Sequence, residues 1–270
     1  MSQIDSDLLR KPLKVACIQI ASGPDKVQNL AKARQKVLQA ASEGASLIIL
    51  PECFNSPYST ARFRDIFVIG GSVPECDTSG KIYNTCAVYS PQGELLAFHR
   101  KMHLFDIDVP GGMSFHESDT LSAGNQITIV NLEGYGKIGL GICYDMRFAE
   151  PSTIAARQGA FALIYPSAFN TTTGPLHWEL LGRARAVDNQ VYTILCSQSR
   201  DPDSSYPAWG YSMVTDPMGR VIAGTKECDD IVYALLDPET IKESRMAIPI
   251  TSQRRHDVYP DIAKLVQLDK

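Results

Sequence analysis

The stretch Gly139-Leu140-Gly141-Ile142-Cys143-Tyr144-Asp145-Met146-Arg147-Phe148 decides the fold class of this chain. The apolar run from Lys137 to Ile142 predicts a buried strand that stops at Cys143, where a polar turn follows. A helix is expected from Pro151 to Gly159, because proline favours the start of a helix and glycine follows its end. A cysteine at such a turn has an exposed sulfur, and nearby backbone N–H groups stabilise a thiolate or an oxyanion. The stretch therefore points to a nucleophile, and the alternative is a buried structural cysteine, as most free cysteines are.

The overall composition is that of a globular protein with ample material for a core. Its 270 residues are 44% hydrophobic and 21% charged, and we expect one domain over 1–270. A net charge of −4 gives no electrostatic reason to expect nucleic acid or a membrane as partner. Seven cysteines without a Cys-x-x-Cys pair fit a reducing compartment. The N-terminus lacks a signal-peptide pattern, and no apolar run approaches the roughly 18 residues of a membrane span. We therefore expect a soluble cytoplasmic protein.

The first part of the chain predicts two parallel strands joined by a helix. Leu13 to Ile20 and Ala45 to Leu50 are apolar almost throughout, which is typical of strands covered on both faces. Between them a helix opens at Pro24-Asp25 and runs to about Ser42, and strand–helix–strand order implies a parallel pair. Glu52 follows the second strand directly, where α/β proteins place their chemistry. The alternative for Glu52 is a structural salt bridge.

The rest of the chain predicts two antiparallel hairpins, of 82–89 with 95–99 and of 127–132 with 137–142. The first hairpin leads to Lys101 and the second to Cys143, and a loop over 105–118 between them carries Glu117. Further strands are expected at 66–69, 161–165, 191–197, 212–215, 220–224 and 231–236, and a helix at 176–188. This order of elements predicts an α/β fold with mixed sheets and outer helices in a layered sandwich.

Three strand ends carry groups whose chemistry is complementary. Glu52, Lys101 and Cys143 each lie on a turn just after a predicted strand. A thiol needs a base to become a nucleophile, and a carboxylate at the end of a buried strand can serve. A tetrahedral oxyanion needs positive charge or N–H donors, for which Lys101 and the backbone N–H of Tyr144 are candidates. Together these residues predict a nucleophile, a base and an oxyanion site.

The motifs around these residues resemble the Glu-Lys-Cys signatures of the nitrilase superfamily of carbon–nitrogen hydrolases. The matching stretches are Leu50-Pro51-Glu52-Cys53, His99-Arg100-Lys101-Met102-His103-Leu104 and Gly141 to Phe148. The resemblance covers about 13–259, and 105–110, 114–118 and 186–190 look most like the ω-amidase branch. It implies a four-layer α-β-β-α sandwich that forms a homodimer, with Glu117 as a second active-site glutamate. The implied reaction is hydrolysis of the terminal amide of 2-oxoglutaramate or 2-oxosuccinamate to a 2-oxo acid and ammonia.

The implied mechanism uses the side chains of the protein and requires neither a metal nor an organic cofactor. Glu52 accepts the proton of Cys143, whose sulfur attacks the amide carbon to give a thioester. Lys101 and the Tyr144 N–H hold the oxyanion. Water activated by Glu52 and positioned by Glu117 then hydrolyses the thioester.

Three residues are candidates for binding the rest of the substrate. Arg147 suits a substrate carboxylate, because a guanidinium binds carboxylates through two parallel hydrogen bonds. The alternative for Arg147 is a structural salt bridge to Glu150 or Asp145. Phe169 and Thr171 follow a strand that ends on the same side as Cys143, so they are expected to line the pocket.

The sequence departs from the resembling family in a shortened segment around 59–69, where an outer helix of the family has no counterpart. This departure leaves open an inactive pseudoenzyme that acts as an interaction protein. Among active alternatives, N-carbamoyl amino acids or deaminated peptide amides would be the substrates. Two further alternatives have a different chemistry. One is a zinc site at His99 and His103, and the other is a hydrolase that uses Cys143 with His177.

Overall fold

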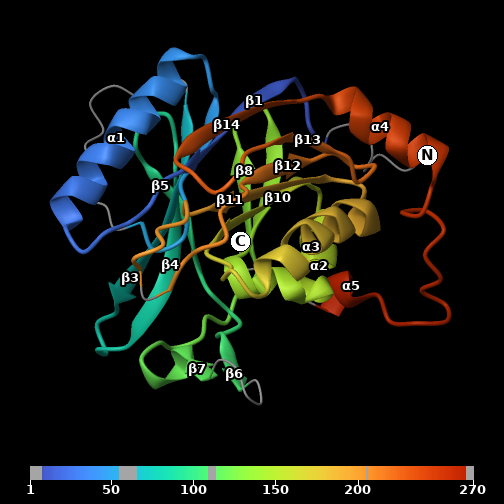
Figure 1. Ribbon diagram of the computed structural model, residues 1–270. Helices are drawn as coiled ribbons and strands as arrows, with labels where there is room; N and C mark the ends of the chain where they lie inside the picture. The colour runs from blue at the N-terminus through green and yellow to red at the C-terminus, as the bar shows by residue number, and fades with distance from the viewer. Residues whose placement is uncertain (1–7, 55–65, 109–113, 205, 266–270) are drawn as a thin grey trace.

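The computed structural model of the protein describes residues 8–54, 66–108, 114–204 and 206–265. Its core consists of two six-stranded sheets (Figure 1). The first sheet has the order β14-β1-β2-β3-β4-β5, with β1 (Leu13–Gln19), β2 (Leu47–Ile49), β3 (Phe67–Cys76), β4 (Ile82–Tyr89), β5 (Leu95–Arg100) and β14 (Asp230–Leu236). The second has the order β13-β12-β11-β10-β9-β8, with β8 (Thr128–Leu132), β9 (Gly136–Leu140), β10 (Ala160–Ser167), β11 (Tyr192–Ser197), β12 (Met213–Thr215) and β13 (Val221–Gly224).

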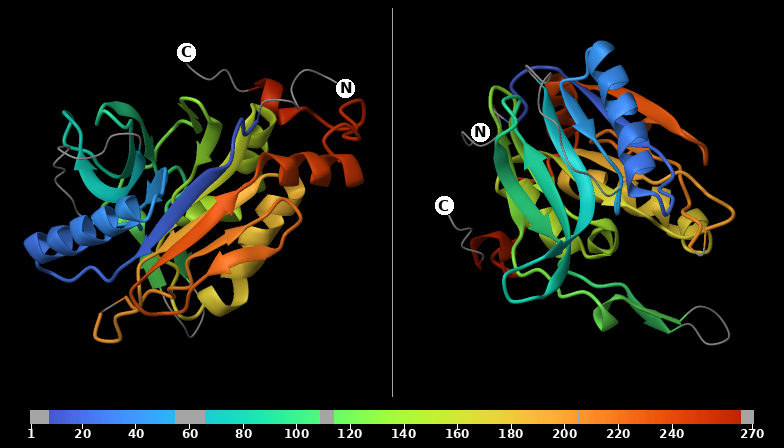
Figure 2. Two further views of the ribbon diagram at one scale, coloured as in Figure 1. Left: turned by 90° about the horizontal axis from the view of Figure 1, so that it is seen from above. Right: turned by 90° about the vertical axis from the view of Figure 1, so that its left-hand side faces the viewer.

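Helices cover the outer faces of both sheets, which gives the predicted four-layer α-β-β-α sandwich (Figures 1 and 2). Helix α1 (Lys26–Ser42) packs on the first sheet, and α2 (Ala149–Arg157) and α3 (Gly174–Asn189) pack on the second. Asp25 caps α1 by accepting hydrogen bonds from the N–H groups of Val27 and Gln28, as N-cap aspartates do. The helices α4 (Pro238–Ala247) and α5 (Ile262–Leu265) follow the last strand.

The alternation of side chains along β1 explains why this strand is apolar on both faces over most of its length. Val15 and Cys17 belong to the core between the sheets, whereas Ala16 and Ile18 belong to the core beneath α1. Successive side chains of a strand point to opposite faces, so a strand in the middle of four layers buries both sets. The parallel pairing of β1 with β2 is confirmed, and β14 pairs antiparallel on the other side of β1.

The sheet topology brings the ends of three strands to one place. Strands β9 and β10 are parallel neighbours, so the turn after β9 lies beside the residues that follow β10. Strand β2 ends just before Glu52, and β5 ends just before Lys101. The residues that follow β2, β5 and β9 therefore lie around one pocket.

The predicted end of a strand at Gly70-Gly71 is wrong, because β3 continues through a bulge to Cys76. Gly71 has φ +64°, and a Cβ there would lie 2.2 Å from the carbonyl oxygen of Pro51. The glycine therefore allows β3 to bend around the turn that carries Glu52, where the N–H of Ser72 donates to Pro51 O.

Other local predictions need correction as well. The segment expected as a loop over 105–118 contains a small antiparallel pair, β6 (Asp106–Asp108) and β7 (Ser114–His116), and the short helix η1 (Glu117–Asp119). The turn at Cys143 is a 3₁₀ helix, η2 (Cys143–Arg147). Helix α4 was not predicted, although Pro238 at its start and the Asp237 cap signal it.

Most of the shortened segment around 59–69 lies outside the described residues. Within the described ranges, the helices are too short or too polar to cross a membrane.

Candidate active site

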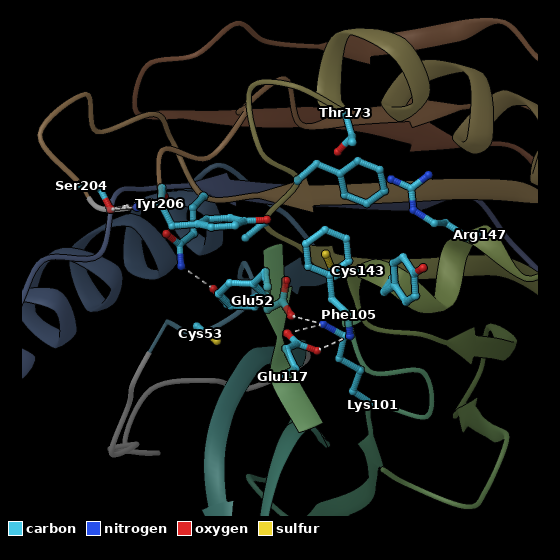
Figure 3. Close-up of a pocket in the computed structure, with 15 residues that line it drawn as sticks. Glu52, Cys53, Lys101, Phe105, Glu117, Cys143, Arg147, Thr173, Ser204 and Tyr206 are labelled. Atoms are coloured by element: carbon cyan, nitrogen blue, oxygen red, sulfur yellow. Dashed lines mark hydrogen bonds and ion pairs between the residues drawn. The ribbon is translucent and has the colours of Figure 1, made fainter. Parts of the chain in front are cut away.

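Cys143 stands at the first position of η2, directly after β9 and Ile142. Its φ of +46° is unusual for a residue with a side chain, and such strain concentrates at functional sites. The side chain lines a cavity of about 240 Å³, a size that suits a small molecule (Figure 3). Tyr144 follows as the second residue of η2, where backbone N–H groups have no partner within the helix.

Glu52 lies in the same cavity and is 4% exposed. Its Oε1 accepts hydrogen bonds from Asn84 Nδ2 at 2.7 Å and from Lys101 Nζ at 3.3 Å. Gln198 Nε2 donates to the backbone oxygen of Glu52 at 2.8 Å, which fixes the turn after β2 from the second sheet. The Cys143 thiol lines the same cavity and lies near enough to the Glu52 carboxylate for that carboxylate to raise the pKa of the thiol. The predicted base and nucleophile are therefore direct neighbours.

Lys101 is almost fully buried between two carboxylates. Its Nζ lies 2.8 Å from Glu117 Oε1 in addition to its contact with Glu52. Glu117 Oε2 accepts a hydrogen bond from the Phe105 N–H at 2.8 Å, so both oxygens of this carboxylate are held (Figure 3). Burial alone lowers the pKa of Lys101, but the charges of Glu52, Cys143 and Glu117 outweigh it and hold that pKa well above its usual value. Lys101 is thus a charged group that is buried at the cavity.

The same surroundings keep the Cys143 thiol protonated at rest. Burial raises its pKa well above the usual value, and the negative charge of Glu52 adds to this effect. The charge of Lys101 and a hydrogen bond from the Ala168 backbone act in the opposite direction but do not prevail. A reaction at this sulfur would need a base for the thiol proton, and the Glu52 carboxylate is the acidic side chain beside it.

Arg147 lines the same cavity as Cys143, and its guanidinium lies 5.0 Å from the ring centre of Phe169 and 5.5 Å from that of Tyr144. Its Nη1 contacts His177 Nδ1 at 3.1 Å. Among the described residues Arg147 has no carboxylate partner, and its buried Nε has no hydrogen-bond partner. The alternative of a salt bridge to Glu150 or Asp145 is therefore not what the structure contains.

Most of the predicted site residues lie together, and Thr171 does not. Glu52, Lys101, Glu117, Cys143, Tyr144, Arg147 and Phe169 all line the cavity. Thr171 is exposed outside it, and Thr173 lines the cavity in its place. The reason is the side chain of Asn170, whose Oδ1 accepts hydrogen bonds from the N–H groups of Thr172 and Thr173 and turns the chain outward at Thr171.

The alternative pairings considered for the histidines do not form in this structure. His177 contacts Arg147, while the side-chain partner of Cys143 is Glu52. His99 and His103 both bind the carboxylate of Asp145. These contacts account for the histidines without a zinc ion.

Sequence reasoning missed several residues of the cavity. Tyr206 and Ser204 approach it from the segment after β11, and Phe115 joins them at an aromatic contact of 5.9 Å with Tyr206. Burial raises the pKa of Tyr206, and so do the nearby charges of Cys143 and Glu52, so its hydroxyl stays protonated. These residues follow no periodic pattern, and the only signal for Phe115 and Tyr206 is an aromatic side chain in a polar loop.

Comparison with known proteins places this geometry in a family. The sequence model of the family described as carbon-nitrogen hydrolase matches residues 14–246. The chain is 49% identical to the omega-amidase NIT3 of Saccharomyces cerevisiae over 95% of its own length and 98% of the relative's. It is 50% identical to the omega-amidase NIT2 of Mus musculus, over 91% of this chain and 96% of the relative. The alignment with NIT3 spans 286 positions although this chain has 270 residues, so the relative has residues with no counterpart here.

Solved structures agree with the sequence comparison. The crystal structure of Nit3 of Saccharomyces cerevisiae, described as a member of branch 10 of the nitrilase superfamily, superimposes with a TM-score of 0.83 at 47% identity. That similarity covers 93% of this chain and 99% of Nit3. The NitFhit protein of C. elegans gives a TM-score of 0.85 at 31% identity, over 93% of this chain and 67% of that protein. With the fold, the cavity and these similarities in agreement, the chain belongs to the carbon–nitrogen hydrolase family of the nitrilase superfamily.

Proposed function

We propose that the protein is an amidase that hydrolyses the terminal amide of small dicarboxylic acid monoamides, such as 2-oxoglutaramate and 2-oxosuccinamate, to the 2-oxo acid and ammonia. The observation that carries the proposal is the cavity itself. It contains a thiol and a buried lysine beside one carboxylate, and it also contains an arginine that has no carboxylate partner among the described residues. The omega-amidase names of the relatives support the same reaction class.

Acylation begins with Glu52 as base and Cys143 as nucleophile. As the sulfur bonds to the amide carbon, the thiol proton passes to the Glu52 carboxylate, which spares the site a free thiolate. The carbonyl oxygen gains negative charge and accepts hydrogen bonds from Lys101 Nζ and the Tyr144 N–H. Glu52 then returns the proton to the nitrogen, the carbon–nitrogen bond breaks, and ammonia leaves a thioester on Cys143.

Deacylation repeats these steps with water. Glu52 accepts a proton from a water molecule whose oxygen attacks the thioester carbon, and the same two donors hold the oxyanion. Glu117 positions this water and keeps Lys101 in place through its 2.8 Å ion pair. When the carbon–sulfur bond breaks, the acid product leaves and the Cys143 sulfur recovers its proton from Glu52.

Arg147 selects the substrate class by binding its carboxylate. A guanidinium that is partly buried between two aromatic rings gains a charge-assisted, two-point contact when an acid enters the cavity. Phe169 provides the apolar wall beside the methylene groups of such a substrate. N-carbamoyl amino acids also present a carboxylate and an amide, and they form the nearest alternative class.

We further propose that the chain works as one domain, as a homodimer, in the cytoplasm, without a metal or organic cofactor. All seven cysteines are free thiols, which is usual in a reducing compartment. Size-exclusion chromatography with light scattering tests the dimer directly.

The deciding experiment measures ammonia release from 2-oxoglutaramate and succinamate, with an N-carbamoyl amino acid as the competing substrate. Wild-type protein is expected to release ammonia from the two dicarboxylic monoamides, and Cys143→Ala is expected to release none. Hydrolysis of the carbamoyl compound in preference would change the substrate class. If the folded wild-type protein hydrolyses none of these compounds, the result favours the alternative of an inactive interaction protein.

A further inference from the structure

Asp145 has a densely hydrogen-bonded side chain near the active site, yet it does not line the cavity. It is 2% exposed and accepts two hydrogen bonds on each carboxylate oxygen. His103 donates to Oδ1 twice, from Nδ1 at 2.7 Å and from its backbone N–H at 2.9 Å. Oδ2 contacts His99 Nε2 at 3.1 Å and the Ile142 N–H at 2.9 Å. A single carboxylate thus satisfies four donors.

These donors come from the two chain segments that carry the proposed oxyanion donors. His99 and His103 lie two residues before and two residues after Lys101, while Ile142 and Asp145 enclose Cys143 and Tyr144. The segment of Lys101 ends a strand of the first sheet, and η2 follows a strand of the second. Asp145 is therefore a direct polar bridge between the two sheets at the site.

We propose that Asp145, together with His99 and His103, is a positioning site that fixes the Lys101 ammonium relative to the Tyr144 N–H, so that both reach the same oxyanion. This inference rests on the proposed amide hydrolysis and assigns it a further residue. Asp145 acts through the two donors and does not touch the substrate. Two donors held on separate sheets stabilise an oxyanion only when their separation is fixed, and an error of about 1 Å costs about a hundredfold in rate.

The surroundings of the two histidines show that the bridge is itself held in place. His99 is fully buried, and its second ring nitrogen contacts Thr128 Oγ1 of β8 at 3.0 Å. The ring of His103 stacks on Phe148 with 3.7 Å between ring centres. Burial of Asp145 favours its neutral form, but the hydrogen bonds from His103 and His99 outweigh it and hold the pKa of this carboxyl far below its usual value. The carboxylate is thus ionised and has no freedom to rotate.

The test compares Asp145→Asn with Asp216→Asn, a matched change at another buried carboxylate. Asp216 is 4% exposed and accepts hydrogen bonds from the N–H groups of Met218 and Arg220 in the turn between β12 and β13, away from the cavity. An asparagine keeps the shape of the side chain but offers one acceptor oxygen in place of two. We expect both variants to melt at a lower temperature.

The kcat values distinguish a loss of positioning at the active site from a general loss of stability. For Asp145→Asn we expect kcat on succinamate to fall about tenfold to a hundredfold with KM nearly unchanged, because the affected donors act in the transition state. Affinity for succinic semialdehyde should fall in parallel, because addition of the Cys143 sulfur to the aldehyde places an oxygen at the oxyanion position. Asp216→Asn should keep kcat and aldehyde affinity. Normal kcat and aldehyde affinity in Asp145→Asn, or an equal loss in Asp216→Asn, would overturn the inference.

A second pair of variants decides the matter if Asp145→Asn does not fold. His103 is partly exposed, so His103→Ala is expected to fold and to lower kcat without a change in KM. His103→Asn places an amide N–H where Nδ1 was and should restore kcat, which a loss of packing alone would not explain. Equal activity of the Ala and Asn variants overturns the inference. A wild-type protein that releases no ammonia contradicts the proposed function instead, while aldehyde binding by the variants still tests the bridge.

Discussion

The buried Lys101 forms an ion pair with the partly buried Glu117, with 2.8 Å between Nζ and Oε1, and the preceding residue, Arg100, belongs to a second ion pair. Arg100 pairs with Glu75 at 2.5 Å on the outer side of the first sheet, where both side chains are partly exposed. The two basic residues are adjacent in sequence, but successive side chains at a strand end point to opposite faces. The lysine therefore enters the active site and the arginine stays at the surface.

The Lys101–Glu117 pair predicts a loss of turnover in Glu117→Gln. One amide oxygen replaces two charged oxygens, so either the hydrogen bond to Lys101 or the one to the Phe105 N–H is lost. We expect kcat to fall by roughly tenfold to a hundredfold, as for other displaced catalytic groups. Glu75→Gln, which removes the ion pair with Arg100, is the control, and steady-state kinetics of both variants measures the effect. Equal kinetics in both variants would show that Glu117 has no part in catalysis.

The protonated state of Cys143 predicts an unusual titration. Burial and the charge of Glu52 both favour the neutral thiol, so no thiolate absorbance from Cys143 should appear below about pH 9. The difference in ultraviolet absorbance between wild type and Cys143→Ala measures this thiolate. Glu52→Gln removes a negative charge and should lower the pKa of the thiol, while Lys101→Met removes a positive charge and should raise it. A thiolate present at neutral pH in the wild type would contradict the proposed proton transfer.

Much of the fold was predictable because burial within the four layers produces recognisable patterns of apolar residues in the sequence. Strands that are buried on both faces, such as β1 and β10, are mostly apolar, and each turn after them is easy to place. Glu52, Lys101 and Cys143 were found from the residues because each lies just after a predicted strand. The glycine pair in β3 was misleading, since glycines that permit a bulge have the same composition as glycines that end a strand.

The rest of the site depends on contacts that sequence patterns do not contain. Glu117 lies on an irregular segment and was identified through the family resemblance alone. Tyr206 reaches the cavity because the segment after β11 folds back and pairs at Ala208 with Asn170, a contact made between distant parts of the chain. Thr171 was expected in the cavity because a loop sequence does not reveal which of its side chains points inward.

The guanidinium of Arg147, which has no carboxylate partner among the described residues, predicts a change in substrate preference in Arg147→Met. Without the charge, KM for succinamate should rise at least about tenfold, the effect expected from losing a charged hydrogen bond of about 1.5–3 kcal/mol. A neutral amide of the same chain length should be hydrolysed as before, because it makes no use of the guanidinium. Arg183→Met, at an exposed arginine of α3 paired with Glu179, is the matched control. If KM for succinamate stays unchanged, Arg147 does not bind the substrate carboxylate.

Gly174, the first residue of α3, packs against the segment that carries Tyr206, so a substitution at Gly174 tests how that segment is held at the cavity. A Cβ on Gly174 would lie 2.3 Å from Cγ of Trp209, and backbone hydrogen bonds hold Trp209 at this position. Its N–H donates to Phe169 O at 2.6 Å, and its backbone oxygen accepts a hydrogen bond from Arg200 at 2.8 Å. Gly174→Ala should therefore displace the lining at Phe169 and reduce the free energy of unfolding by about 1–3 kcal/mol.

Because Glu52, Lys101 and Cys143 come from other elements, Gly174→Ala should raise KM for succinamate more than it lowers kcat. Denaturant unfolding and steady-state kinetics measure the two effects on one preparation. Gly23→Ala is the control, since the nearest atom to a Cβ there is 3.9 Å away and the substitution should leave both quantities unchanged. Wild-type stability and KM in Gly174→Ala would mean that the contact between Gly174 and Trp209 does not hold the wall of the cavity in place.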